Sequence, residues 1–188
     1  VQASRGEYGA ATRSLEESLS LKALPETTEQ QMRYNLAQLY LASEEPARAI
    51  TVLEAWFGQA DSPPASAWLL LGHTHAELGN YRKAIPAMKR AIRLSDSPPP
   101  DWYENLLAMH YELHEFRDCA ALLERMIRLF PDRDDYWWQL SGIRMTLNQP
   151  AQALAVMELM QRSGRLTREQ ELVQLAQLYL YQEIPYKA

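Results

Sequence analysis

The chain has 188 residues, 47% hydrophobic and 23% charged, a composition typical of a folded protein and unlike a disordered one. Its net charge is −5 and its basic residues are scattered, which excludes the concentrated positive surface of a nucleic-acid-binding protein. No apolar run is long enough to cross a bilayer, so direct membrane insertion is not expected. Glycine is rare and no stretch alternates apolar and polar residues as strands do, so an all-α fold is predicted.

A small residue opens a helical pattern six times along the chain at nearly constant spacing. These anchor residues are Ala11, Ala49, Ala84, Cys119, Ala153 and Ala188. The successive spacings are 38, 35, 35, 34 and 35 residues. A period this regular indicates repeated helix pairs stacked into a solenoid, in which each pair buries its apolar face against the next.

In chain order, the pattern divides the chain into six segments. Their predicted boundaries are 1–24, 29–60, 65–98, 100–131, 134–164 and 168–188. The first is interpreted as the second helix of a truncated repeat and the last as the first helix of another, with four complete helix pairs between them. Because neither end has polar capping residues, we expect a trimmed piece of a longer array that self-associates through its uncapped ends.

The segment 65–98 carries the clearest motif. It reads Trp68-x-x-Leu71-Gly72-x-x-His75 and then, after a turn, Ala84-x-x-x-Met88. These residues resemble the tetratricopeptide repeat (TPR) family, whose pattern is W-x2-L-G-x2-Y followed by A-x3-F. Here His75 takes the place of the Tyr and Met88 that of the Phe. The resemblance implies a right-handed superhelix of antiparallel helix pairs that acts by binding proteins.

Small residues in the first helix of each pair are predicted to let the paired helices approach closely. They are Gly72, Ala108, Ser141 and Ala176. Matching Ala108 with Gly72 makes the turn of segment 100–131 one residue shorter than that of segment 65–98. The close packing predicts that Gly72→Trp unfolds at least its local repeats, which a thermal unfolding measurement would detect.

The TPR resemblance also implies where a partner binds, because the first helices line the concave surface in this family. The predicted partner-binding groove consists of Tyr34, Gln38, Leu69, His73, Trp102, Asn105, Met109, Trp138, Met145, Gln177 and Tyr181. This set is aromatic, amide-bearing and almost free of positive charge, so the Lys/Arg/Asn carboxylate clamp of chaperone-binding TPR proteins is missing. Contact with an extended or helical segment is expected instead. The alternative is that Trp102 and Trp138 only pack between adjacent repeats.

No catalytic motif is present, so neither an enzyme nor a cofactor is predicted. His110 and His114 are four residues apart on a predicted helix, but no third ligand is near them, and no metal site is predicted. His75 is interpreted as a core residue, and Cys119 as an inert buried thiol. A single cysteine cannot form an internal disulfide, which suits a reducing compartment and the periplasm equally.

A narrower resemblance lies in the C-terminal third. Residues 135–142 (DYWWQLSG), 175–181 (LAQLYLY) and 184–188 (IPYKA) are similar to TPR proteins that accompany TonB–ExbB–ExbD systems. This implies a periplasmic adaptor of a Gram-negative bacterium that contacts TonB-, ExbB- or ExbD-type components during iron or siderophore uptake. A cytoplasmic location stays open. The alternatives are an assembly factor for pili, secretion or cell-wall machinery, and a regulatory TPR region of a larger enzyme or sensor.

Overall fold

The structure is a computed structural model that describes residues 2–21, 24–167 and 169–182. The regular secondary structure of these residues consists of ten α-helices and no strand, which confirms the predicted all-α class. The sequence predicts one continuous array, whereas the structure divides into two compact units, Val1–Pro98 and Pro99–Ala188. This division leaves every helix pair whole, as expected when each pair packs mainly on its neighbours in the chain. The two units are described separately.

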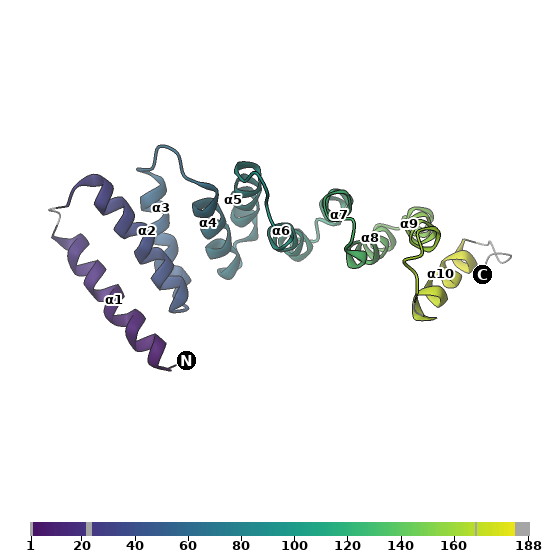
Figure 1. The fold of residues 1–188 in the computed structure, drawn as a ribbon, viewed down its shortest axis with the longest axis horizontal. Coiled ribbons are helices and arrows are strands. Elements are labelled where there is room, and N and C mark those ends of the chain that lie inside the picture. The colour runs from purple at the N-terminus through teal and green to yellow at the C-terminus, as the bar shows by residue number, and fades with distance from the viewer. Residues whose placement is uncertain (1, 22–23, 168, 183–188) are drawn as a thin grey trace. The chain divides into compact units, whose positions relative to one another are not determined.

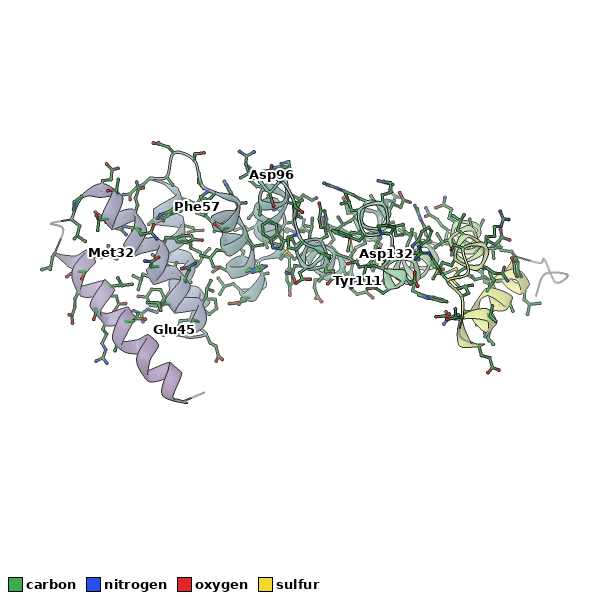
Figure 2. The ribbon with its side chains drawn as sticks, in the orientation of Figure 1. Met32, Glu45, Phe57, Asp96, Tyr111 and Asp132 are labelled. Atoms are coloured by element: carbon green, nitrogen blue, oxygen red, sulfur yellow. The ribbon has the colours of Figure 1, made fainter. Side chains whose placement is uncertain are left out.

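The first unit contains five helices, and consecutive helices run antiparallel (Figure 1). They are α1 (Gln2–Ser20), α2 (Glu26–Ala42), α3 (Pro46–Phe57), α4 (Ala65–Glu77) and α5 (Tyr81–Leu94). Within this unit, each helix packs against its neighbours in the chain. The α3 and α4 helices are joined by aromatic contact, because the ring of Phe57 (labelled in Figure 2) lies 4.6 Å from that of Trp68.

The second unit repeats this arrangement. Its helices are α6 (Pro100–Glu112), α7 (Phe116–Leu129), α8 (Asp134–Thr146), α9 (Pro150–Arg162) and α10 (Glu169–Tyr181). Pro150 occupies the start of a second helix, as Pro46 does in the first unit, and a proline there removes no intrahelical hydrogen bond. The predicted anchor Ala188, with the rest of the 184–188 motif, lies outside the described residues.

The turn inside each helix pair has the same backbone geometry. One residue in each turn has a positive φ: Glu44, Gly79, His114 and Asn148 at 61°, 70°, 55° and 56°. The next amide donates back to the carbonyl five residues earlier, for example Asn80 N–H to His75 O at 2.8 Å. This is a Schellman-type helix end, and it returns the chain at a fixed angle. The positive-φ positions are 35, 35 and 34 residues apart, so they give the true register of the repeats.

That register corrects the alignment of segment 100–131. Gly72 lies seven residues before Gly79, and the residue seven before His114 is Leu107, not Ala108. Leu107 is buried while Ala108 is exposed. The turns between α4 and α5 and between α6 and α7 have equal length, so no shortening occurs. The sequence alignment was wrong by one residue because it matched small side chains with one another. In the fold, the position equivalent to Gly72 is occupied by the larger Leu107.

Four of the predicted anchor residues are fully buried in the fold. Ala49, Ala84, Cys119 and Ala153 are all 0% exposed, because each second helix packs there against its first helix. The predicted anchor Ala11 is an exception, since it is exposed and its neighbour Thr12 is buried instead. Taking Thr12 in place of Ala11 shortens the first spacing from 38 to 37 residues, so this repeat stays longer than the others.

Candidate functional site

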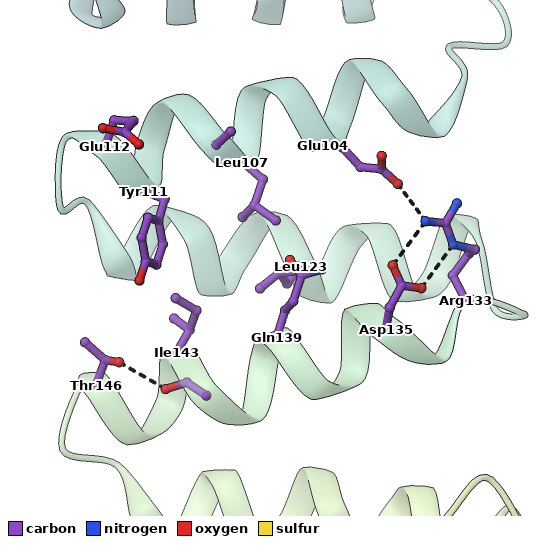
Figure 3. A pocket seen from close by; sticks show the side chains of 12 residues that line it. Glu104, Leu107, Tyr111, Glu112, Leu123, Arg133, Asp135, Gln139, Ile143 and Thr146 are labelled. Atoms are coloured by element: carbon purple, nitrogen blue, oxygen red, sulfur yellow. Dashed lines mark hydrogen bonds and ion pairs between the residues drawn. The ribbon is translucent and has the colours of Figure 1, made fainter.

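A hollow of about 610 Å³ lies between the first helices α6 and α8 of the second unit (Figure 3). We call it the α6–α8 hollow. Its lining comprises Glu104, Leu107, Ala108, Tyr111, Glu112, Leu123, Arg133, Asp135, Gln139, Gly142, Ile143 and Thr146. The second helix α7 contributes only Leu123, which is fully buried and forms part of the floor. The hollow therefore belongs to the face that the first helices present.

A second hollow of about 540 Å³ follows between α8 and α10. We call it the α8–α10 hollow. Its lining comprises Trp138, Ser141, Gly142, Met145, Met157, Gln174, Gln177, Leu178 and Tyr181. Gly142 lines both hollows, so they meet at the middle of α8. Together they form what we call the unit-2 groove.

The two hollows are equivalent sites one repeat apart. Trp138 follows Glu104 by 34 residues, and Met157 follows Leu123 by the same number. The same backbone geometry thus offers different chemistry in each repeat. Gly142, between them, has no heavy atom within 4 Å of the position where a Cβ would stand, so a side chain added there would enter open space.

At one end of the α6–α8 hollow, Arg133 bridges the two first helices (Figure 3). Its guanidinium donates to Glu104 of α6 at 2.9 Å and to Asp135 of α8 at 3.0 Å. It also lies 4.9 Å from the ring centre of Tyr136, whose hydroxyl donates to Glu104. Burial, together with the hydrogen bond to the Glu104 carboxylate, raises the pKa of Tyr136. The cluster fixes the positions of both carboxylates.

At the other end of the same hollow, Tyr111 and Glu112 are both exposed. The Tyr111 ring packs edge-on against Phe116, with 5.6 Å between ring centres. Within the part of the chain that the structure describes, Glu112 makes no ion pair. Three carboxylates and one guanidinium therefore line the α6–α8 hollow, which gives it a net charge of −2 at neutral pH.

Among the described residues, none that lines the α8–α10 hollow is charged. Met145 and Tyr181 are 38% and 62% exposed, so they offer apolar and aromatic surface to solvent. The amides of Gln174 and Gln177 stand on α10, where they can donate to and accept from a partner backbone. Beneath them, Met157 is buried in a core cluster that also contacts Trp138.

The structure brings four of the predicted groove residues together: Trp138, Met145, Gln177 and Tyr181 all line the α8–α10 hollow. In the first unit, Tyr34 lines a smaller hollow of about 230 Å³ beside Trp56, with 5.4 Å between their rings. Three further predicted residues lie on the surface or partly beneath it. Gln38 is exposed on α2, and Leu69 and His73 are half-buried on α4.

The three residues predicted on α6 do not line the α6–α8 hollow. Met109 is only 4% exposed, and Trp102 and Asn105 are half-buried. Their places are taken by Glu104, Ala108 and Tyr111. This follows from the one-residue slip in segment 100–131. Carrying the true period of 35 residues forward from Leu69 and His73 leads to Glu104 and Ala108, so the repeat spacing was the signal that could have found them.

Comparison with solved structures identifies the architecture. A crystal structure of MamA protein aligns with a TM-score of 0.64 at 19% identity, covering 89% of this chain and 90% of that chain. A crystal structure of YrrB, described as a TPR protein with an unusual peptide-binding site, aligns with a TM-score of 0.61 at 18% identity, covering 95% and 86%. Residues 34–101 also match the sequence profile of the tetratricopeptide repeat. The chain has the TPR fold.

A longer protein chain is similar as well. The structure of Naa15/Naa10 bound to HypK-THB aligns with a TM-score of 0.71 at 14% identity, covering 94% of this chain and 27% of that chain. Among curated proteins, no sequence match is found. None of the described helices of this chain has the length and hydrophobicity of a membrane span.

The TPR register also explains the histidines. His110 is 3% exposed, and its Nδ1 lies 2.6 Å from Glu115. His114 is outside the helix, in the positive-φ turn position, so the two rings do not share a helix face as the sequence predicted. Glu115 and Asp118 bring carboxylate oxygens within 4.8 Å of His110, but carboxylates are ordinary where a helix such as α7 begins, and we assign no metal.

Two further sequence predictions concern buried groups. His75 is 5% exposed, as expected for a core residue in the Tyr position of the TPR motif. Its pKa is lowered, first by burial and then by Lys83. Cys119 is fully buried, and burial raises the pKa of its thiol to about 11. A thiol in that state is a poor nucleophile at neutral pH, which agrees with the prediction of an inert residue.

Proposed function

We propose that this chain is a protein-interaction scaffold that binds a segment of a partner protein along the unit-2 groove. One observation carries the proposal: two hollows of about 610 and 540 Å³ meet at Gly142 on the face formed by the first helices. The resemblance to the TPR family implies that a partner binds on this face. Each is large enough for several side chains of a bound peptide.

The chemistry of the groove supports a peptide ligand. Exposed Tyr111, Met145 and Tyr181 are of the residue types enriched in protein interfaces, and the open Gly142 lets a partner backbone approach α8 closely. The glutamine amides of α10 match the polar groups of an extended chain. YrrB, which is similar in fold, is described as having a peptide-binding site, and the similar Naa15/Naa10 structure contains a bound HypK-THB.

The test is selection of a displayed library of random 12-residue peptides on the chain and on two variants. Gly142→Trp places an indole where the two hollows meet, and we expect it to abolish binding of the selected peptides. Ala155→Trp adds the same side chain to an exposed position of α9 outside both hollows, and it should bind normally. Circular dichroism checks that both variants are folded. Failure to enrich any peptide, or equal binding by Gly142→Trp, would contradict the proposal.

Within this role we propose, more narrowly, a periplasmic adaptor of a TonB-dependent energy-transduction complex. Its support is the sequence resemblance of residues 135–142 and 175–181 to TPR proteins of such systems. Eight of these residues line the unit-2 groove: Asp135, Trp138, Gln139, Ser141, Gly142, Gln177, Leu178 and Tyr181. The resembling motifs therefore coincide with the surface proposed to bind a partner.

Affinity purification of the full-length protein from cell-envelope extracts tests this narrower role. Recovery of TonB, ExbB or ExbD by the wild type and by Ala155→Trp, but not by Gly142→Trp, would support both the adaptor and the groove. Recovery of pilus, secretion or cell-wall components in their place would favour the alternative of an assembly factor. Recovery of TonB-system proteins by all three would support the adaptor and place its contact outside the groove.

A further inference from the structure

From the lining of the unit-2 groove we infer which partner segment it selects: one that carries a basic side chain three to four residues from a large apolar side chain. The basic group would occupy the α6–α8 hollow and the apolar group the α8–α10 hollow. This inference rests on the proposed function, because it assumes that the groove binds a peptide.

The charge of the α6–α8 hollow favours a cation. Glu104 and Asp135 share the single guanidinium of Arg133, so the cluster keeps one negative charge. Glu112 adds a second at the opposite end of the hollow, without an ion-pair partner among the described residues. A Lys or Arg side chain entering between these ends would be attracted from both, while an acidic side chain would be repelled.

The fold does not require a charge at the centre of this cluster. The positions equivalent to Glu104 in the other first helices are Tyr34, Leu69 and Trp138. Aromatic or aliphatic residues therefore satisfy the packing of this position elsewhere in the same chain. Among these four helices, only α6 has a carboxylate at this position. Hydrogen bonds from Arg133 and Tyr136 hold that carboxylate in place.

The α8–α10 hollow is suited to an apolar group. Its walls carry Trp138, Met145, Leu178 and Tyr181, and its floor is the sulfur-containing side chain of Met157. Methionine side chains adapt to different apolar shapes, and aromatic rings provide contact area at a low entropy cost. Because none of the described lining residues is charged, a cation buried among them would lose its hydration without gaining a counter-ion.

The expected spacing follows from the helix that separates the hollows. They lie on either side of α8 and meet at Gly142. A helix with its side chains is about 10–12 Å across. An extended chain advances about 3.3 Å per residue. Side chains that reach both hollows should therefore be separated by roughly three to four residues.

The peptides selected as described above give the first readout: the inference expects enrichment of Lys or Arg three to four residues from Phe, Leu, Met or Trp. The second readout is fluorescence anisotropy with one enriched peptide and its Arg→Glu form. Glu112→Lys should weaken binding of the enriched peptide by about fivefold or more and should strengthen binding of the Arg→Glu form. Asp132→Lys, at an exposed carboxylate that lines neither hollow, is the matched control and should change neither.

The outcomes separate this inference from the proposed function. Suppose that Gly142→Trp fails to bind the enriched peptides. If these peptides lack a basic residue, or if they bind Glu112→Lys as well as they bind the wild type, the inference is overturned and the groove remains the binding site. Binding that Gly142→Trp does not affect would overturn both. A charge-reversed pair that restores affinity, Glu112→Lys with the Arg→Glu peptide, would support both.

Discussion

His75 is a polar side chain held in the core of the first unit. It is 5% exposed, and its Nδ1 has no hydrogen-bond partner among the described residues. Burial and the nearby Lys83 lower its pKa, while Glu54 acts weakly in the opposite direction. The folded chain therefore keeps the ring neutral at a pH where the unfolded chain, with an ordinary pKa of about 6.5, takes up a proton.

This linkage predicts a pH effect on stability. Below about pH 6.5 the unfolded state binds more protons than the folded state, so the free energy of unfolding must fall as the pH is lowered. We expect the Tm of the wild type to drop more between about pH 7.5 and 5.5 than that of His75→Tyr, which restores the residue of the TPR motif. Calorimetry of the two proteins measures the difference. His73, whose pKa burial also lowers, is present in both and cancels. Equal slopes would show that His75 does not titrate in this way.

Two glycines in first helices give a matched pair of substitutions. A Cβ on Gly72 would stand 2.8 Å from both Cγ and Sδ of Met88, whereas a Cβ on Gly142 would meet nothing within 4 Å. Gly72→Ala should therefore destabilise the first unit by about 1–3 kcal/mol through overpacking. Gly142→Ala should stabilise α8 by about 0.5–1 kcal/mol, because alanine loses less backbone entropy on folding. Urea unfolding of both variants tests the signs, and a stabilising Gly72→Ala would refute the close packing of α4 on α5.

At the scale of helices, a hydrogen bond from a buried tyrosine to a carboxylate links two helices more than once. Tyr40 of α2 donates to Glu16 of α1, and the guanidinium of Arg48 lies 4.4 Å from the Tyr40 ring centre. Burial, with the Glu16 hydrogen bond next, raises the pKa of Tyr40 to about 12. Tyr136 forms the same kind of link with Glu104 and Arg133. The motif combines an apolar ring in the core with a hydroxyl that donates to a partly exposed carboxylate.

This link predicts the effect of removing one hydroxyl. Tyr136 is 0% exposed, so Tyr136→Phe leaves the ring packing intact and deletes only the hydrogen bond to Glu104. We expect a loss of about 1–2 kcal/mol in unfolding free energy, since the acceptor is charged but partly exposed. Tyr111→Phe, at a 53% exposed tyrosine of the same unit, is the control and should change stability little. In a double-mutant cycle, Glu104→Gln should cost less in the Tyr136→Phe background; full additivity would mean that the two groups do not interact.

Over the whole molecule, helices pack mainly against their neighbours in the chain. Stability in such an array is approximately a sum of repeat and nearest-neighbour terms, so a local defect stays local. Gly72→Ala should therefore speed hydrogen exchange in α4 and α5 and leave α8 and α9 unchanged. Mass-spectrometric hydrogen exchange on peptides from both units measures this. Gly142→Ala is the converse test, because it should change exchange in the second unit and leave α4 and α5 unchanged. Faster exchange in α8 and α9 of Gly72→Ala would show cooperativity across the whole chain.

The sequence by itself determined the helical class and the repeat, because the period of buried small residues is imposed by local helix packing. Ala49, Ala84 and Ala153 are fully buried as that period requires. It also led to Trp138 and Tyr181 in the α8–α10 hollow, since a helix face follows from spacing once the register is right.

Only the tertiary structure decided the register of segment 100–131 and, with it, the chemistry of the α6–α8 hollow. Leu107 occupies the position equivalent to Gly72, where the sequence had predicted the small residue Ala108. Side-chain size misled the alignment, whereas the positive φ at His114 fixes the register. The ion cluster at Glu104 likewise depends on Arg133, 29 residues later in the chain. A contact between residues so far apart in the chain cannot be predicted from the sequence near either residue. It forms only when the fold brings two first helices together on either side of the second helix between them.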